Sequence, residues 1–514
     1  MMNHLPVLPI VLPLLVAGLM VLLEKRGVGL QRALGLGSSL AQLVIAGWLV
    51  NRAASGEISV YLLGNWEAHL GIALAVDRLS ALMLLTTALL GLVALLYAAA
   101  GWERSAPHFH ALFQIQLVGL NGAFLTADLF NLFVFFEVLL IASYGLMLSG
   151  GRGERMRAGL HYVAFNITAS TLYLFAVGLL YGLLGALNLA ELAERISVAP
   201  ATNLPLIAAA GGLLLVVFCA KAALFPLSLW LPETYPRTPA PVVALFAIMT
   251  KLGVYSVLRV FSVLFPDGSG ALAGYVWPWL LPLAGAGLAL AALGTLAATT
   301  LRTLVGYLVV GSAATLFIAV AANRPEAWGA GLYYLVHSSF AAAALFLIVD
   351  MVRRQRLNAG DNLRQIDHLG QRGVLGAVFC LAAVSAIGLP PLAGFIGKLS
   401  LLAALPADLA HWAWPLILLS SLLLLIALAN AGSQVFWRQT EPPLDRTASP
   451  ASPLQWAAVW LLLLAGAGLV GLGGPILQYT QDSGSQLANP IEYRQALLQA
   501  KPVSTAVNTP GVAP

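Results

Sequence analysis

Charged residues inside apolar stretches are the part of this sequence best suited to chemistry. Glu137 stands in a run of phenylalanine and leucine, and Lys221, Lys251 and Lys398 lie in surroundings just as apolar. A charge near the centre of a bilayer costs about 2.5–3.5 kcal/mol on insertion scales. One carboxylate and three ammonium groups in separate apolar segments therefore indicate a path for protons or ions. The alternative for each group is a structural ion pair, or a side chain that reaches the membrane interface.

Glu137 and Lys221 form the simplest predicted switch. Burial and a nearby cation act on a carboxylate in opposite senses, so its charge can change on demand. A lysine in a low-dielectric site gives up its proton readily when its carboxylate partner moves away. The paired state would hold Lys221 charged, and the separated state would release a proton toward Lys251.

His337 and Lys398 extend the predicted path into the second half of the chain. Histidine titrates near neutrality and passes a proton through either ring nitrogen, although a lone membrane histidine is as often just hydrogen-bonded to a neighbouring helix. Waters would bridge any gap beyond about 3.5 Å. We order the path as Glu137, Lys221, Lys251, His337 and Lys398.

The two cysteines, Cys219 and Cys380, both lie in apolar runs and are predicted to be buried thiols. They have no CxxC or Cys/His spacing, so we expect no disulfide framework and no iron–sulfur site. Dinucleotide, phosphate-loop and zinc motifs are also missing, and we therefore predict no cofactor and no bound metal. The net charge of +5 is explained by membrane topology and does not indicate nucleic acid.

The composition predicts an all-α polytopic membrane protein. Of 514 residues, 60% are hydrophobic and only 9% are charged, against about 25% charged in soluble domains. About 20 helical residues cross the hydrocarbon core, whereas the strands of an outer-membrane barrel would be short and alternating. The first apolar stretch is expected to be a membrane span and not a cleaved signal peptide. We place about fourteen spans, at 5–23, 30–50, 78–100, 109–127, 129–149, 161–186, 205–231, 239–264, 273–298, 303–322, 327–350, 374–404, 411–437 and 454–474.

Prolines interrupt two of these spans next to a lysine. Pro226 and Pro232 follow Lys221, and Pro390-Pro391 precede Lys398. Broken helices in corresponding positions of two halves mark binding sites in transporters. Because the breaks are five spans apart, we predict two inverted five-helix repeats, in spans 4–8 and 9–13; two unrelated proline kinks are the alternative. The predicted divisions are 1–108 with helices 1–3, 109–265 with the first repeat, 273–438 with the second repeat, and 439–514 with helix 14 and a C-terminal tail. In that tail, 486–500 could form a short surface helix, and 501–514 is expected to be disordered.

Loop charges predict the orientation. Sixteen of the 26 Lys and Arg residues fall in loops on one side and six on the other. The richer side should be cytoplasmic, and both termini would then lie outside a bacterial inner membrane. Asp128, an acidic residue on the outer side, is a candidate for the point where a cation enters.

Four segments resemble one family. They are residues 130–148 with Glu137, the stretch KAALFPLSLWLP at 221–232, TKLGVY at 250–255 and GLPPLAGFIGK at 388–398. Together they resemble the antiporter-like subunits of respiratory complex I and of Mrp-type cation/proton antiporters, over nearly the whole chain. Residues 128–137 are most similar to the D-type subunits of Mrp antiporters. The resemblance implies fourteen helices, inverted repeats and the glutamate–lysine switch.

Two departures from the complex I pattern matter. Lys398 stands where the middle antiporter-like subunit of complex I usually has glutamate, and the lysine that many relatives carry shortly after His337 is missing. The second departure places more weight on His337 or on water, and it argues against a standard complex I pump. The chain also lacks the long lateral helix of the largest such subunit.

The resemblance implies a subunit that exchanges cytoplasmic Na⁺ or K⁺ for external protons. It would act in a hetero-oligomer with other membrane subunits, as a secondary transporter and not an enzyme. One alternative is a proton-pumping subunit of a redox complex such as complex I or a membrane-bound hydrogenase. Another is a scaffold that has kept inherited charges without conducting.

Overall fold

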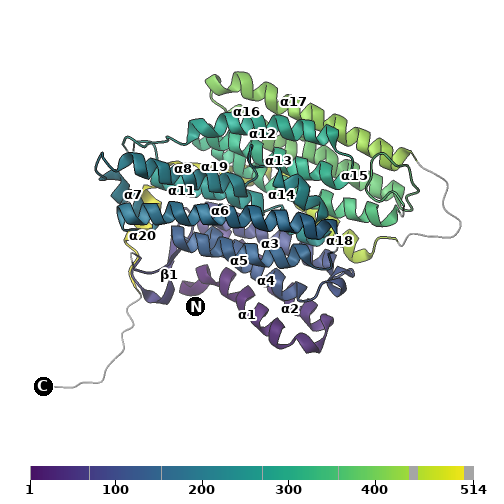
Figure 1. Ribbon diagram of the computed structural model, residues 1–514, viewed down its shortest axis with the longest axis horizontal. Coiled ribbons are helices and arrows are strands. Elements are labelled where there is room, and N and C mark those ends of the chain that lie inside the picture. Colours follow the sequence, from purple (N-terminus) through teal and green to yellow (C-terminus); the bar gives the residue numbers. More distant parts are fainter. Residues whose placement is uncertain are drawn as a thin grey trace.

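Long apolar helices that lie side by side make up most of the structure (Figure 1). The computed structural model describes residues 2–68, 70–151, 153–268, 270–356, 358–438 and 450–502. The first half holds α1 (Leu8–Leu22), α2 (Val28–Ala54), α3 (Arg78–Ala98), α4 (Phe109–Leu125), α5 (Leu129–Leu148), α6 (Glu154–Leu184), α7 (Leu189–Ser197), α8 (Leu204–Lys221), α9 (Trp230–Thr234), α10 (Ala240–Phe246) and α11 (Met249–Leu264). The second half holds α12 (Trp277–Ala297), α13 (Leu301–Ala321), α14 (Pro325–Gln355), α15 (Arg372–Ile387), α16 (Ala393–Ala404), α17 (Ala407–Gly432), α18 (Pro453–Gly471), α19 (Gly473–Ala488) and α20 (Ile491–Leu498). A hairpin of β1 (Ser59–Leu62) and β2 (Ala73–Val76) pairs its strands antiparallel.

The membrane fold predicted from composition is confirmed. Twelve helical segments in the described part of the chain are long and apolar enough to cross a bilayer, one of them formed by α10 and α11 together, and each matches a predicted span. The other two predicted spans fall on shorter apolar helices, one on α4 and one divided between α15 and α16. The exact count of fourteen stays a prediction.

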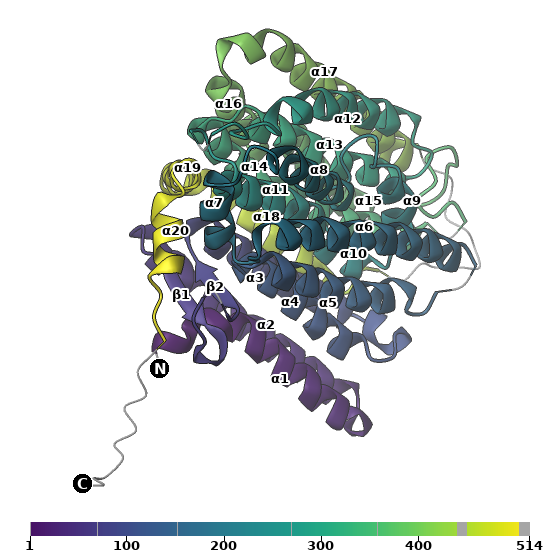
Figure 2. The same ribbon diagram turned by 60° about the vertical axis from the view of Figure 1, so that its left-hand side comes forward.

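The central helices are the most buried ones. The segment from α10 to α11 and the helix α14 are completely buried over their most apolar window, whereas the same window of α17 is only 22% buried. Figure 2 shows α1 and α2 along one edge of the bundle and α17 along the opposite edge. Side chains on α11 and α14 are therefore shielded from lipid by a layer of outer helices.

Both proline-containing breaks occur where the sequence predicts them. The helix α8 ends at Lys221 itself, and irregular backbone continues to Trp230, where α9 begins. The helix α15 ends before Gly388, whose φ of 87° is a left-handed conformation that favours glycine, and α16 begins at Ala393. The first break leaves Lys221 at the end of α8, and the second leaves Lys398 within the short helix α16.

A third break was not predicted from the sequence. The expected span at 239–264 divides into α10 and α11. Between them the Ile248 nitrogen donates to the Leu245 carbonyl three residues back, at 3.2 Å, in place of the usual four-residue spacing. This tighter turn places Lys251 in the first turn of α11. Proline and glycine are missing from 242–252, so the break has no local sequence signal.

Matching contacts in the two halves support the predicted inverted repeats. Asp128 caps α5 and forms a bridge with Asn188, after α6, while Thr300 caps α13 and forms a bridge with Asn362, after α14. The first bridge lies beside β2, where the Ala127 nitrogen donates to the Ala73 carbonyl. The second lies at the opposite end of the bundle, because Arg302 and the end of α14 line one pocket there. The repeats themselves stay a prediction, as do the four predicted divisions of the chain.

Two smaller predictions need correction. Cys219 is buried as expected, but Cys380 is exposed, because its side of α15 faces outward. The predicted surface helix at 486–500 is divided between the end of α19 and α20, and Tyr493 and Leu497 of α20 are buried against the bundle. Most of the tail predicted to be disordered, 503–514, lies outside the described residues.

Candidate functional site

Lys221 sits at the C-terminal end of α8, where the helix stops. Its side chain is buried, and within the described part of the chain its Nζ has no hydrogen-bond partner. The ammonium group lies 4.8 Å from the centroid of the Phe136 ring, a distance at which a cation is attracted to an aromatic face. An ammonium group held this way lacks strong partners and can readily change them.

Glu137 is half-buried on α5 and accepts a hydrogen bond from Ser170 of α6. The predicted ion pair between Glu137 and Lys221 is not formed, because the two side chains do not come within 4.0 Å of each other. The arrangement therefore corresponds to the separated state of the predicted switch. Ser170 was not identified from the sequence.

Lys251 is fully buried on α11, and its Nζ donates to Ser312 Oγ of α13 at 2.8 Å. Close packing brings α11 against the end of α8. A Cβ on Gly253 would lie 2.6 Å from the Ala222 nitrogen, so only glycine allows this approach. The helices that carry Lys221 and Lys251 are thus in direct backbone contact.

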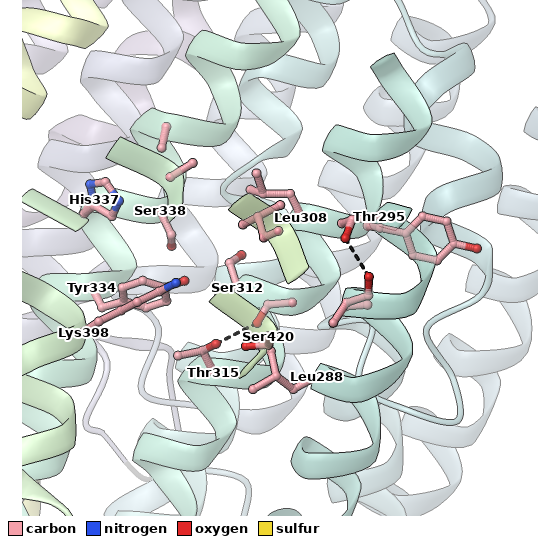
Figure 3. Close-up of a pocket in the computed structure, with 17 residues that line it drawn as sticks. Leu288, Thr295, Leu308, Ser312, Thr315, Tyr334, His337, Ser338, Lys398 and Ser420 are labelled. Atoms are coloured by element: carbon pink, nitrogen blue, oxygen red, sulfur yellow. Dashed lines mark hydrogen bonds between the residues drawn. The ribbon is translucent and has the colours of Figure 1, made fainter. Parts of the chain in front are cut away.

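A polar cavity joins the two halves of the predicted path. Its lining includes Ser312, which binds Lys251, together with His337, Tyr334 and Lys398. Figure 3 shows Ser312 in the middle of this lining, with His337 and Lys398 to one side. The volume of the cavity that the centres of water molecules can occupy is about 40 Å³. One buried water needs roughly 10–15 Å³ measured in this way. A few waters therefore fit between Ser312 and Lys398.

Lys398 and His337 occupy the far side of this cavity. The Lys398 ammonium donates to the Ile387 carbonyl at 2.8 Å, at the broken end of α15, and to Ser421 of α17 at 2.7 Å. The carbonyl group is available because the helix stops there. His337, on α14, is buried and lines the same cavity as Lys398. A Cβ on Gly394 would lie 2.8 Å from His337 Nε2, so glycine at the start of α16 makes room for the imidazole.

Asp128 lies apart from these five residues. It is buried beside the hairpin at the start of α5, and its carboxylate accepts a hydrogen bond from the Asn131 nitrogen at 2.7 Å. This is an ordinary N-cap contact, which satisfies one of the free amides of a helix start. This contact gives Asp128 a structural role at the start of α5, and its predicted role as the point where a cation enters stays a prediction.

Among the described residues, His, Cys, Asp and Glu side chains do not gather in threes that could hold a metal ion. The serines that contact the predicted path, Ser170, Ser312 and Ser421, were missed by sequence reasoning because serine is common in apolar helices and carries no pattern of its own.

Similarity to known proteins agrees with this geometry. Residues 126–426 match the family model described as NADH:quinone oxidoreductase/Mrp antiporter, TM. A relative from Rhizobium meliloti (strain 1021), named as the D-type subunit of a probable K(+)/H(+) antiporter, is 38% identical, over 97% of this chain and 98% of the relative. The D-type subunit of the Na(+)/H(+) antiporter of Bacillus subtilis (strain 168) is 37% identical, over 97% of this chain and 100% of its own length.

A solved structure shares the fold. A chain in the Mrp complex from Dietzia sp. DQ12-45-1b superposes with a TM-score of 0.86 at 28% identity, over 96% of this chain and 99% of that chain. The resemblance found in the four sequence segments therefore extends over nearly all of the chain. The chain belongs to the NADH:quinone oxidoreductase/Mrp antiporter family, as a membrane subunit of a multisubunit antiporter.

Proposed function

We propose that this subunit moves protons along Glu137, Lys221, Lys251, His337 and Lys398 while its complex exports Na⁺ or K⁺ from the cytoplasm. The observation that supports this most is the cavity between Ser312 and Lys398, which has room for a few waters. A proton that leaves Lys251 would pass to the Ser312 hydroxyl beside it, then to water in the cavity, and then to the His337 imidazole or the Lys398 amine. The relatives named as K(+)/H(+) and Na(+)/H(+) antiporter subunits support the choice of a monovalent cation.

The separated state of Glu137 and Lys221 gives the exchange a starting point. With its carboxylate at a distance, the Lys221 ammonium is weakly held and can pass a proton across the contact between α8 and α11. When Glu137 approaches again, a charged Lys221 is favoured and a proton is taken up. Each cycle thus moves one proton toward Lys251 and restores the pair.

The test uses everted vesicles from cells that lack other antiporters and express the complete set of partner subunits. Respiration sets up a pH gradient, and Na⁺ or K⁺ is then added to the wild type, to Lys221→Ala and to Lys251→Ala. We expect the cation to collapse the gradient in the wild type and at least roughly tenfold more slowly in both variants, a change of about 1.4 kcal/mol in barrier.

Lys25→Ala is the matched control, because Lys25 is exposed outside the helices of the path. Wild-type exchange in Lys221→Ala, with normal assembly, would instead support a scaffold that does not conduct. No exchange in any sample, wild type included, would contradict the antiporter proposal or mean that the assembly is incomplete.

Orientation is part of the same proposal. We place the arginine-rich end of the bundle in the cytoplasm and both termini outside, in the bacterial inner membrane. The structure supports this by gathering Arg155, Arg302, Arg353 and Arg354 at one end, away from the hairpin. Alkaline phosphatase fused after residue 502 should be active, whereas a fluorescent protein at the same point should stay dark.

A redox-driven pump is the second candidate, because the matched family includes transmembrane subunits of NADH:quinone oxidoreductase. The energy would then come from electron transfer in other chains. The two candidates differ in what co-purifies with the subunit: the redox pump requires flavin or iron–sulfur absorption, and the antiporter requires only hydrophobic subunits. Cofactor absorption that scales with the purified subunit would favour the redox pump.

A further inference from the structure

An arginine-lined pocket lies at the end of the bundle opposite the hairpin, away from the proposed proton path. Arg155 reaches it from α6, Arg302 from α13, and Arg353 and Arg354 from the end of α14, beside Trp102. The pocket therefore lies where the first predicted repeat meets the second. None of these side chains takes part in the path from Glu137 to Lys398.

The charges in this pocket do not cancel. Asp350 binds both Arg353 and Arg354, at 3.1 and 2.7 Å, and also accepts a hydrogen bond from Tyr97. Arg302 is bound to Asp361 at 2.8 Å. Although burial raises the pKa of Asp361, hydrogen bonds from Arg302 outweigh it and hold the pKa below its ordinary value, so the carboxylate is charged. Four guanidinium groups against two carboxylates leave a net charge of two positive units.

Arg155 carries much of this excess. Within the described residues it has no carboxylate partner; it donates to the carbonyls of Arg237 and Ser149 and lies 5.5 Å from the Trp102 ring. Arg353 and Arg302 are the like charges that act on it, opposed by Asp350. Neighbouring Arg237 is already bound to Glu233 at 2.9 Å and lies 3.9 Å from Glu154, so those acids do not neutralise the pocket.

An unused donor points to the kind of ligand. The Trp102 Nε1–H is buried and has no hydrogen-bond partner in the described structure. A buried donor left unpaired costs about 1–3 kcal/mol. The volume of the pocket that the centres of water-sized atoms can occupy is about 20 Å³. This volume admits roughly one or two oxygen atoms. Guanidinium groups match the geometry of phosphate oxygens, which they bind by paired hydrogen bonds.

We propose that this pocket binds a phosphate group, with one or two of its oxygens between Trp102 and the four arginines. The rest of the anion stays at the surface, where Arg353 and Arg354 are about two-fifths exposed. Bound there, the phosphate links α6 to α13 and α14 at one end of the bundle. The phosphate belongs either to an anionic lipid headgroup at the membrane surface or to free inorganic phosphate.

The experiment measures binding by the complete purified complex after lipid has been removed. Midpoints of heat unfolding are followed during titration with inorganic phosphate, and separately with phosphatidylglycerol or phosphatidylcholine nanodiscs. We expect the ligand to raise the unfolding midpoint of the wild-type complex. Arg155→Gln and Arg353→Gln should each need roughly tenfold more ligand for the same rise, which corresponds to about 1.4 kcal/mol of binding free energy. The second variant leaves Arg354 on Asp350, so it tests the pocket even if Arg155→Gln fails to assemble.

Arg157→Gln is the matched control, because Arg157 is exposed on the same first turn of α6. It should bind like the wild type. Stabilisation by inorganic phosphate alone identifies the free anion, and stabilisation only by phosphatidylglycerol identifies the lipid. The proposal would be overturned if the two lipids had equal effects in all variants, or if neither phosphate nor lipid changed the unfolding midpoint. The second of these results would favour an acidic group from a partner subunit as the occupant of the pocket. Because binding is the readout, this result does not depend on antiport activity.

Discussion

Ser312 is the hydrogen-bond partner that the structure gives to the buried ammonium of Lys251. Its hydroxyl accepts from Lys251 and donates to the Val309 carbonyl in its own helix. A hydroxyl group both donates and accepts, so when its proton turns away from Val309 it can pass that proton to a water molecule in the cavity while it accepts one from Lys251, which an apolar side chain cannot do. The proposed path therefore depends on this serine as well as on the charged residues.

Ser312→Ala should slow cation-driven proton exchange by roughly tenfold or more, because it leaves a buried ammonium unpaired at a cost of about 1–3 kcal/mol. Initial rates in everted vesicles would measure this, and Ser312→Thr should restore most of the rate. Ser256→Ala is the control: Ser256 is as buried on α11, but it donates to the Leu252 carbonyl of its own helix. Equal rates in Ser312→Ala and Ser256→Ala would contradict the relay.

That charged side chains lie inside the helix bundle could be predicted from the sequence, but their hydrogen-bond partners could not. Glu137 and Lys251 are recognised because a charge in an apolar span has a large cost that something must offset. Ser170 and Ser312 have no such cost, and which serine faces a charge depends on how the helices pack. The separation of Glu137 from Lys221 is likewise a property of packing, since the sequence is compatible with either state.

The contact between α8 and α11 holds the two lysine-bearing helices together. It depends on Gly253, where a Cβ would meet the Ala222 nitrogen at 2.6 Å and the Ala222 Cβ at 2.7 Å. Backbone atoms cannot move aside as a flexible side chain can, so the helices would have to separate. Separation would lengthen the step between Lys221 and Lys251.

Gly253→Ala should lower the midpoint of heat unfolding, by an overpacking cost of about 1–3 kcal/mol, and should also slow exchange. Purified complexes and vesicle assays would test both effects. Gly212→Ala provides the comparison, since a Cβ there meets no atom within 4 Å although Gly212 is on α8. If the two variants behave alike, close packing at Gly253 is not what positions the lysines.

Helix breaks show which elements can be predicted from sequence. Proline marks the breaks after Lys221 and before Lys398, because its ring removes a backbone hydrogen bond. The break between α10 and α11 has no proline or glycine and is set by the surrounding helices, since the whole segment is buried. The exposure of Cys380 was mispredicted for a similar reason: an apolar run does not reveal which helix face meets lipid.

A buried ion pair connects three parts of the chain that are far apart in the sequence. Asp77, at the start of α3, accepts two hydrogen bonds from Arg259 of α11, each at 2.7 Å. The Arg259 guanidinium also lies 4.6 Å from the ring of Tyr493 in α20. The pair therefore fixes the N-terminal helices and the C-terminal helices to the first predicted repeat.

Breaking this pair should be far more damaging than replacing it. Asp77→Leu or Arg259→Met alone leaves one buried charge unpaired and should destabilise the complex by about 3–5 kcal/mol, whereas the double variant removes both charges and should recover most of the loss. Midpoints of heat unfolding of the purified complex would measure this, with Arg52→Gln as the control because Arg52 binds Glu57 at an exposed site. An exposed pair contributes about 0–1 kcal/mol, so that variant should unfold like the wild type. If the double variant lost as much stability as the two single variants together, the two charges would act independently. The three parts of the chain would then have to be held together by apolar packing alone.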